Sequence, residues 1–189
     1  MLDPYGDRMK AYEAEETSRK LARTFPIYAR LDGRSFSKFT KGMNRPFDLR
    51  FQKAMDFVTR TLVEQTHAKI GYVQSDEISL LWYHETPQSE PLFGAKTHKL
   101  TSVLPSLGAA ALSWGIQNNF GSEGMTLRGK LPHFDCRVLN LPSKLEASNM
   151  ILWRAMDCKK NSISMVAQSH FSHKELHGAD QGKMLAQSF

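Results

Sequence analysis

Apolar and polar positions alternate along short stretches of the chain in a way that predicts three β-strands. Between residues 25 and 31 every second side chain is apolar, which is typical of a half-buried strand, and Asp32-Gly33 ends this run. Residues 72–83 and residues 134–141 are two further apolar runs with the character of a strand. Each strand signal is separated from the next by a segment long enough for a helix.

Apolar residues recur at intervals of three and four between and after these strands, which is the spacing of a helix with one buried face. Asp48 is placed to cap a helix that runs to about Lys69 and is closed by Gly71. Pro105 lies inside a later helical pattern, where we expect it to kink the helix or to end one segment and open another. The predicted helices are residues 7–23 (charged, on the surface), 48–69, 100–114 and 146–170.

The predicted order of elements is β-α-β-α-β-α, with strands too short and too exposed for a large doubly wound sheet. The fold class is therefore α/β (α+β), a two-layer sandwich with an antiparallel sheet of the ferredoxin-like type. A length of 189 residues corresponds to one domain, and we expect residues 1–189 to form it. The three tryptophans, Trp82, Trp114 and Trp153, are interpreted as core residues.

Composition and charge restrict the class of protein and its partners. Hydrophobic residues make up 41% and charged residues 23% of the chain, which excludes a disordered chain and a disulfide scaffold. The 25 basic and 19 acidic residues leave a net charge of +6, which suits a polyanionic partner without requiring one. Only two cysteines occur, and no run approaches the roughly 20 apolar residues of a membrane-spanning helix, so we expect a cytoplasmic protein without a membrane partner.

Acidic residues at two of the predicted strands are the most informative chemical feature. Asp32 lies where the first strand gives way to a loop, and Asp76-Glu77 lies inside the second apolar run. If these strands are neighbours, Asp32 and Asp76 can face one another, and such carboxylates repel unless a cation or a proton lies between them. Because Mg²⁺ prefers oxygen ligands and keeps open positions for phosphate oxygens, the pair points to metal-dependent phosphate chemistry.

The segment after Asp32 has the composition of a triphosphate-binding turn. Gly33 has no Cβ, so its backbone can approach a metal or phosphate closely and its carbonyl can act as a ligand. The peptide groups of residues 33–37, with the hydroxyls of Ser35 and Ser37, could line the phosphates. A plainer interpretation stays open, because an Asp-Gly pair after a strand is most often a turn, and an acidic residue in a strand can simply face solvent.

Basic side chains are candidates for holding phosphate or RNA, although a solvated surface charge is the simpler interpretation for any single one. The pair Lys159-Lys160, beside Asn161 and Ser162, combines charged and polar groups that suit a phosphate. The other candidates are Arg30, Arg34, Lys38, Lys41, Arg45, Lys96, Lys99, Arg128, Lys130 and Arg154.

Four motifs follow one another along the chain at these positions. They are Arg30-Leu31-Asp32-Gly33-Arg34-x-Phe36-x-x-Phe39, Ser75-Asp76-Glu77-x-Ser79, Phe134-Asp135-x-Arg137-Val138 and Trp153-Arg154-x-x-Asp157-Cys158. Together they closely resemble tRNA-His guanylyltransferase and its relatives, the 3′-to-5′ nucleotide polymerases. The resemblance implies a single palm-type catalytic domain over residues 1–189 that uses two Mg²⁺ ions. It also implies that ATP activates a tRNA 5′ end, which the 3′-hydroxyl of GTP then attacks.

The resemblance further implies roles for individual residues. Asp32, the Gly33 carbonyl and Asp76 would be the metal ligands, and Glu77 would support Asp32 and Asp76 in catalysis. The nucleoside triphosphate would be held by Asp32, Gly33, Arg34, Ser35, Phe36, Ser37, Ser75 and Asp76. Contacts to phosphate or RNA would come from Arg30, Arg45, Lys96, Lys99, Lys159 and Asn161.

Two departures from the family pattern refine this expectation. Eukaryotic members carry a His-Ile-Asn-Asn-Leu-Tyr-Asn motif, whereas residues 159–165 here read Lys-Lys-Asn-Ser-Ile-Ser-Met, and only Asn161 is retained. The chain is in this respect more similar to the bacterial, archaeal or viral relatives, which repair truncated tRNA 5′ ends. Family members usually continue for several dozen residues more, so we expect that their C-terminal part is missing or truncated here. The resemblance also implies a homodimer or homotetramer.

Two alternatives to a tRNA nucleotidyltransferase stay open. Palm-fold nucleotide cyclases share the architecture and the two-metal chemistry, although residues 74–78 lack the paired glycines of their signature turn. A non-catalytic RNA-binding module would also explain the basic charge, although it would not need Asp32 and Asp76. Formation of a cyclic nucleotide without RNA would identify the first alternative, and tight tRNA binding without Mg²⁺-dependent turnover would identify the second.

Overall fold

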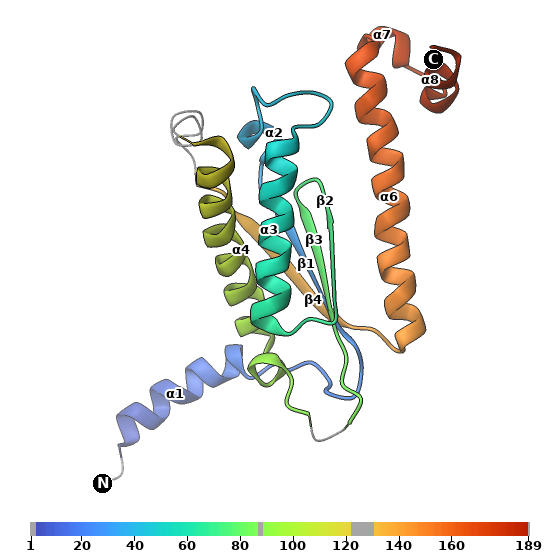
Figure 1. Cartoon of the computed structure of the whole chain (residues 1–189). Coiled ribbons are helices and arrows are strands. Elements are labelled where there is room, and N and C mark those ends of the chain that lie inside the picture. The colour runs from blue at the N-terminus through green and yellow to red at the C-terminus, as the bar shows by residue number, and fades with distance from the viewer. Residues whose placement is uncertain (1–2, 87–88, 122–130, 189) are drawn as a thin grey trace.

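A four-stranded antiparallel sheet with the order β2-β3-β1-β4 lies at the centre of the protein (Figure 1). The structure is a computed structural model that describes residues 3–86, 89–121 and 131–188. The strands are β1 Ile27–Gly33, β2 Ile70–Gln74, β3 Glu77–Trp82 and β4 Phe134–Asn140. With the helices between them, the order β-α-β-β-α-β is the ferredoxin-like arrangement and confirms the predicted α/β fold with its antiparallel sheet.

Helices lie on both sides of this sheet. α3 and α4 pack on one face, which makes the two layers of the predicted sandwich, and α6 faces the other (Figure 1). α1 extends away from the sheet and has no buried residue, as expected of the predicted surface helix. The helices are α1 Pro4–Thr17, α2 Phe36–Phe39, α3 Leu49–Thr66, η1 Leu92–Ala95, α4 Thr97–Phe120, α6 Lys144–His170, α7 His173–Leu176 and α8 Gln181–Ser188.

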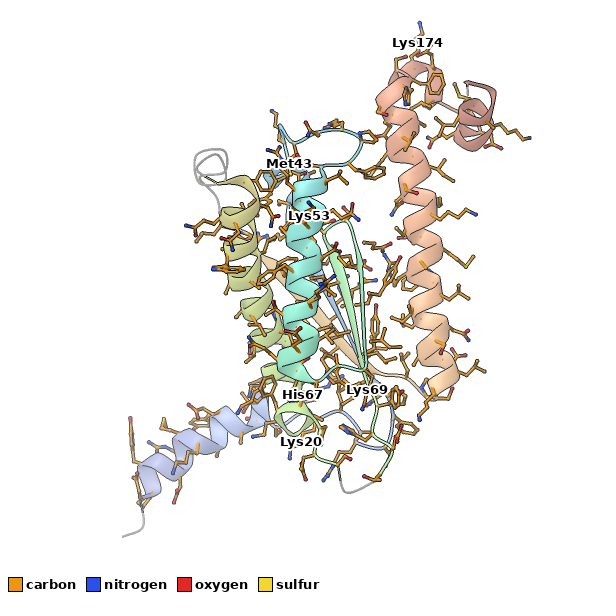
Figure 2. All side chains as sticks on the ribbon, in the orientation of Figure 1. Lys20, Met43, Lys53, His67, Lys69 and Lys174 are labelled. Atoms are coloured by element: carbon orange, nitrogen blue, oxygen red, sulfur yellow. The ribbon has the colours of Figure 1, made fainter. Side chains whose placement is uncertain are left out.

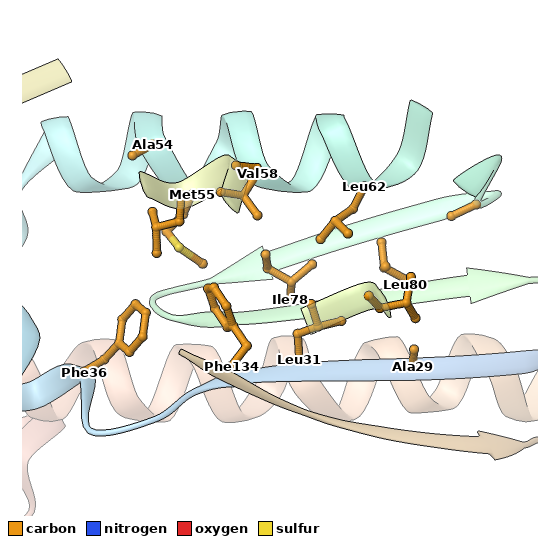
Figure 3. Close-up of a cluster of buried hydrophobic side chains, with 14 of the residues drawn as sticks. Ala29, Leu31, Phe36, Ala54, Met55, Val58, Leu62, Ile78, Leu80 and Phe134 are labelled. Carbon is orange, nitrogen blue, oxygen red and sulfur yellow. The ribbon is translucent and has the colours of Figure 1, made fainter. Parts of the chain in front are cut away.

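The main hydrophobic core lies between the sheet and the two helices α3 and α4. Ala29 and Leu31 of β1 enter it together with Ile78 and Leu80 of β3, at every second position of each strand (Figure 3). The side chains of α3 that meet them recur at the predicted helical spacing: Phe51, Ala54, Met55, Val58 and Leu62. Burial of this apolar surface fixes which face of each strand is turned away from the core.

The opposite face of the sheet is apolar at one end and polar at the other. Because successive side chains of a strand alternate between faces, Tyr28, Arg30 and Asp32 of β1 lie on the side of α6. Tyr28 and Leu81 pack with Ala147 near the start of α6. Towards the end of β1 the apolar side chains give way to Arg30 and Asp32, so this face becomes polar there.

The structure corrects the prediction of one continuous strand over residues 72–83. That segment is a hairpin, because β2 and β3 pair antiparallel and Ser75-Asp76 form the turn between them. Ser75 reverses the chain in the left-handed region, with a φ of 51°. Asp76 therefore lies in a turn and not within a strand. Because the turn has only two residues, Ser75 and Asp76, it hardly interrupts the apolar run over residues 72–83, and the pattern alone does not reveal it.

Two predictions about helices are also corrected. Asp48 caps α3 as predicted, and its side chain accepts a hydrogen bond of 2.9 Å from the backbone two residues on. The helix ends before His67, which adopts a left-handed conformation, and so it does not extend to Gly71. α4 continues through Pro105 as one helix, and this proline is buried, although it cannot donate the backbone hydrogen bond of a helix interior.

Candidate active site

The turn between β2 and β3 lies directly against the end of β1. The backbone N–H of Gly33 donates a hydrogen bond of 3.1 Å to the carbonyl oxygen of Asp76. A Cβ atom at Gly33 would lie 2.8 Å from Asp76 Oδ2 and 2.5 Å from Cδ2 of Phe36, so only glycine allows this close approach. The sheet thus brings two of the three predicted metal-binding groups next to each other.

Asp32, the third of these groups, precedes Gly33 on the sheet face toward α6. Its partners in register are Glu77 on β3 and Asp135 on β4, so three acidic residues lie in one row across the sheet. Arg137 on β4 partly compensates this charge, with Nη1 3.7 Å from Asp32 Oδ2 and Nη2 3.4 Å from Asp135 Oδ1. The side chains of Asp32 and Arg137 remain partly exposed, so a ligand can reach them from solvent.

The surroundings of Asp76 oppose the ionisation of its carboxyl group. Burial raises the pKa of Asp76, and the negative charges of Asp32 and Glu77 raise it further. Hydrogen bonds from its own backbone and from Ser75 act in the opposite direction and do not cancel the effect of burial. A cation bound between the carboxyl groups of Asp32 and Asp76 would remove this repulsion.

The groups at this corner suit a hard cation such as Mg²⁺. Asp32 and Asp76 offer carboxylate oxygens and Gly33 offers a carbonyl oxygen, which are the ligands that this ion prefers. Within residues 3–86, 89–121 and 131–188, no three His, Cys, Asp or Glu side chains gather into a metal centre. A cation held here would therefore need further oxygens from water or from a bound phosphate, as is usual for Mg²⁺.

Glu77, the remaining predicted catalytic residue, is held from the side of α6. Its carboxylate accepts two hydrogen bonds from the guanidinium group of Arg154, at 2.6 and 2.7 Å. Gln74 donates a third at 3.1 Å, and Nε of Arg30 lies 3.8 Å away. Both carboxylate oxygens of Glu77 are therefore engaged by basic and amide groups, directly beside the turn that carries Asp76.

The predicted triphosphate-binding turn leads from the end of β1 into the short helix α2. Ser35 adopts a left-handed conformation with a φ of 58°, and the N–H of Arg34 donates 2.8 Å to the carbonyl oxygen of His133. Phe36 is buried among other aromatic rings and anchors the turn to the core. The side chains of Arg34, Ser35 and Ser37 remain exposed, so they are available to a ligand.

Four of the six predicted phosphate or RNA contacts lie on elements around this end of the sheet or on α6. Arg30 lies on β1, two residues before Asp32, and Arg45 is exposed in the loop that follows α2. Lys159 and Asn161 are exposed on α6, which passes the same face of the sheet (Figure 1).

Lys96 and Lys99 are not brought to this corner. Lys96 immediately precedes α4 and pairs with Lys20, which Figure 2 shows at the end of the molecule away from α2. Lys99 follows in the first turn of α4. Because β1 runs from that end toward α2, these lysines and Asp32 lie at opposite ends of the strand (Figure 1). Two further candidates, Arg128 and Lys130, lie outside the described residues.

Sequence reasoning missed the position of Arg154. The pattern presents it as a phosphate candidate, whereas the structure buries it against Glu77 with an exposure of 7%. Its neighbour Trp153 is 52% exposed and Trp114 is 55% exposed, so only Trp82 of the three tryptophans belongs to the core. The sheet residue that meets this part of α6 is the charged Glu77. α6 therefore turns Arg154 towards the sheet and leaves Trp153 exposed, although the sequence favours a buried tryptophan.

Solved structures with a similar fold identify the class of protein. A bacterial tRNA(His) guanylyltransferase-like protein in complex with ATP matches with a TM-score of 0.86 and 35% sequence identity, over 95% of this chain and 76% of its own. Another such structure, in complex with GTP, matches with a TM-score of 0.80 and 34% identity, over 92% and 79%. The fold is thus that of a palm-type nucleotidyltransferase.

Sequence comparison then gives the family. The profile of the tRNAHis guanylyltransferase family matches residues 6–142. The tRNA(His) guanylyltransferase of Schizosaccharomyces pombe is 30% identical over 152 residues, covering 79% of this chain and 55% of that protein. An uncharacterized protein of Acanthamoeba polyphaga mimivirus is 29% identical over 201 residues, covering 97% and 68%. The chain belongs to the tRNAHis guanylyltransferase family, as the four motifs predict, and spans roughly half to two thirds of these two relatives.

Proposed function

We propose that the protein is a metal-dependent nucleotidyltransferase that adds GMP or other nucleotides to the 5′ end of tRNA in the 3′-to-5′ direction. Its substrate is tRNA-His or a tRNA with a truncated 5′ end. Family membership supports this proposal, as do the ATP and GTP bound in the two similar bacterial structures. The observation that carries it is the contact between Gly33 and Asp76, which brings Asp76 to the end of β1, where Asp32 lies and where its charge acts on the Asp76 carboxyl group.

In this proposal the acidic residues at the end of β1 hold metal ions. Asp32, Asp76 and the Gly33 carbonyl would hold two Mg²⁺ ions, which would supply activation of the attacking hydroxyl and stabilisation of the leaving group. Glu77 supports these residues from the adjoining position on β3. The raised pKa of Asp76 supports the assignment, because a carboxyl group that resists ionisation by itself gains from a nearby cation.

The turn after β1 binds the nucleoside triphosphate in this proposal. Its exposed hydroxyl groups and backbone N–H groups donate to phosphate oxygens, and Phe36 keeps the turn in place. The nucleotide-binding residues are Asp32, Gly33, Arg34, Ser35, Phe36, Ser37, Ser75 and Asp76. Arg30, Arg45, Lys159 and Asn161 contact phosphate or RNA near this site, while Lys96 and Lys99 contact a more distant part of the RNA.

The proposal also covers domain, assembly and compartment. We infer that residues 1–189 form a single palm-type catalytic domain and that the protein is a homodimer or homotetramer. Exposed apolar residues along α6, Leu152, Trp153 and Met156, support an association of subunits. Cys136 and Cys158 are unpaired, which supports a cytoplasmic location. Among the described helices, none has the length and apolar character needed to cross a bilayer.

Primer extension on a 5′-truncated, 5′-monophosphorylated tRNA with ATP, GTP and Mg²⁺ tests the function. We expect the wild-type protein to extend this tRNA, and EDTA to stop the reaction. Asp76→Ala should abolish extension because a metal ligand is lost. Gly33→Ala should do the same because the new Cβ would collide with the Asp76 carboxylate.

Asp7→Ala is the matched control, because Asp7 is an exposed carboxylate on α1, far along the chain from the site. It should extend the tRNA as the wild type does. Undiminished extension by Asp76→Ala would remove the site assignment, and wild-type protein that yields no extended tRNA would contradict the function itself.

A further inference from the structure

The ion pair between Glu77 and Arg154 is the most buried charge interaction near the site. Arg154 Nε lies 2.6 Å from Glu77 Oε1 and Nη2 lies 2.7 Å from Oε2, so the guanidinium group binds both oxygens. The two residues are only 8% and 7% exposed. A buried carboxylate is costly unless its oxygens are paired, and a bidentate arginine is the side chain that pairs both at once.

No other basic group in the described part of the chain substitutes for Arg154. Arg30 Nε is 3.8 Å from Glu77 Oε2 and has no hydrogen-bond partner, so Arg30 adds charge but no bond. Gln74 donates one hydrogen bond to Oε1 and leaves Oε2 to Arg154. Arg154 itself is oriented by Asp157, one helical turn later, at 3.0 Å. The position of the Glu77 carboxylate therefore depends mainly on one helix residue.

This pair also joins α6 to the polar end of the sheet. Near its start α6 packs on the sheet through Ala147 and Ile151, which are part of a small apolar cluster. Further along the helix the contact becomes polar, where Arg154 binds Glu77. α6 is thus held by polar groups against the sheet face that carries Asp32 and Glu77.

We propose that Arg154 is a positioning residue for the turn that carries Asp76. By binding both oxygens of Glu77, it fixes the start of β3 and compensates the charge of a carboxylate that lies beside Asp32 and Asp76. Asp76 precedes Glu77 directly, and its carbonyl oxygen accepts from Gly33, so its place against β1 depends on the same anchor. The expected effect of Arg154 on catalysis rests on the proposed function, whereas its expected effect on the position of the turn does not.

Arg154→Lys tests this inference because lysine keeps the charge but cannot bind both oxygens as a planar fork. Hydrogen exchange of the Gly33 amide reports directly on the contact with Asp76. We expect this amide to exchange at least about tenfold faster in the variant, since the turn opens more often. In the extension assay kcat should fall by about tenfold or more while the KM for GTP changes little, because positioning and not GTP binding is lost.

Arg50→Lys is the matched control. Arg50 also binds a buried carboxylate with two nitrogens, Nε at 3.1 Å and Nη2 at 2.9 Å from Asp48, but at the start of α3. It should lower the melting temperature without accelerating exchange at Gly33. If Arg154→Lys does not fold, the double variant Glu77→Gln/Arg154→Met removes both charges together, and the same faster exchange is expected.

Equal Gly33 exchange in wild type and Arg154→Lys, or an equal acceleration in Arg50→Lys, would overturn the positioning role. A failure of the proposed function would give a different result. The wild-type protein would then not extend tRNA, and the exchange measurement would still decide whether Arg154 fixes the turn.

Discussion

The carboxyl group of Asp76 combines two properties that rarely stay together without a ligand. It is half-buried, and it lies near the negative charges of Asp32 and Glu77, so its pKa is raised. At the same time Gly33 gives it a backbone contact that no larger residue would allow. A half-buried acid that is costly to ionise, and yet is held in place, is typical of a functional site and not of a residue that only stabilises the fold.

Asp76→Asn should therefore stabilise the metal-free protein while it abolishes activity. A raised pKa means that the favourable contribution of protonated Asp76 is present below its unfolded pKa and is lost as the pH rises through the folded pKa. At neutral pH the wild type carries the cost of the buried charge, and the amide does not. Thermal melting in EDTA should show a higher melting temperature for Asp76→Asn.

The same experiment with Mg²⁺ and GTP provides the contrast. We expect these ligands to raise the melting temperature of the wild type more than that of Asp76→Asn, because only the carboxylate gains from the cation. An exposed control, Asp7→Asn, should behave as the wild type in both buffers. A lower melting temperature of Asp76→Asn in EDTA would show that its carboxylate is a net stabilising group.

Elements in this protein are positioned by a few close contacts between helices and strands. β2 comes close to α3 at Gly71, where a Cβ atom would lie 2.5 Å from Cγ2 of Val63 and 3.0 Å from Cγ2 of Thr59. Valine and threonine are stiff side chains, so neither can move far to make room. This contact sets the position of β2 and, through the hairpin, of the turn at Ser75 and Asp76.

Gly71→Ala should lower the free energy of unfolding by about 1–3 kcal/mol, the usual cost of adding a methyl group to a closely packed contact. Urea denaturation followed by circular dichroism measures this change. Gly182→Ala in α8 is a suitable control, because the nearest atom to its Cβ is 3.4 Å away and alanine favours a helix. If both variants unfold at the same urea concentration as the wild type, the contact at Gly71 has room to relax.

On the scale of the whole molecule, the two faces of one sheet serve different purposes. The face toward α3 and α4 contains the hydrophobic core, and the face toward α6 carries the charged residues Arg30, Asp32 and Arg137. The net charge of +6 gives the protein a favourable interaction with a polyanion. A tRNA bound by this charge would release counterions, so its affinity should depend on salt.

Lys159→Ala should weaken tRNA binding and reduce the slope of log affinity against log salt by about one, as expected for one lost phosphate contact. Filter binding at several salt concentrations measures this slope. Lys183→Ala is the control, because Lys183 lies on α8 with its Nζ 4.0 Å from Asp180. If the slope of log affinity against log salt changes equally in both variants, Lys159 does not make a specific contact with the RNA.

Much of the fold could be predicted from the pattern of the chain. Alternation identified β1, an apolar run identified β4, the intervals of three and four identified α3, and Asp48 marked the start of that helix. The hairpin at Ser75 could not be seen, because a turn of two residues fits inside an apolar run. The positions of Trp153 and Arg154 were also missed, since the periodicity of α6 does not say whether its neighbour is apolar or charged.

The sequence by itself determined most of the elements, the family and the residues near which chemistry is expected, because local periodicity and short motifs depend on neighbours along the chain. The tertiary structure decided which of those residues meet. It brings Asp76 against Gly33 and Arg154 against Glu77, and it leaves Lys96 at the other end of β1. These contacts join segments far apart in the chain, and only the pairing and packing of the sheet fix their distance.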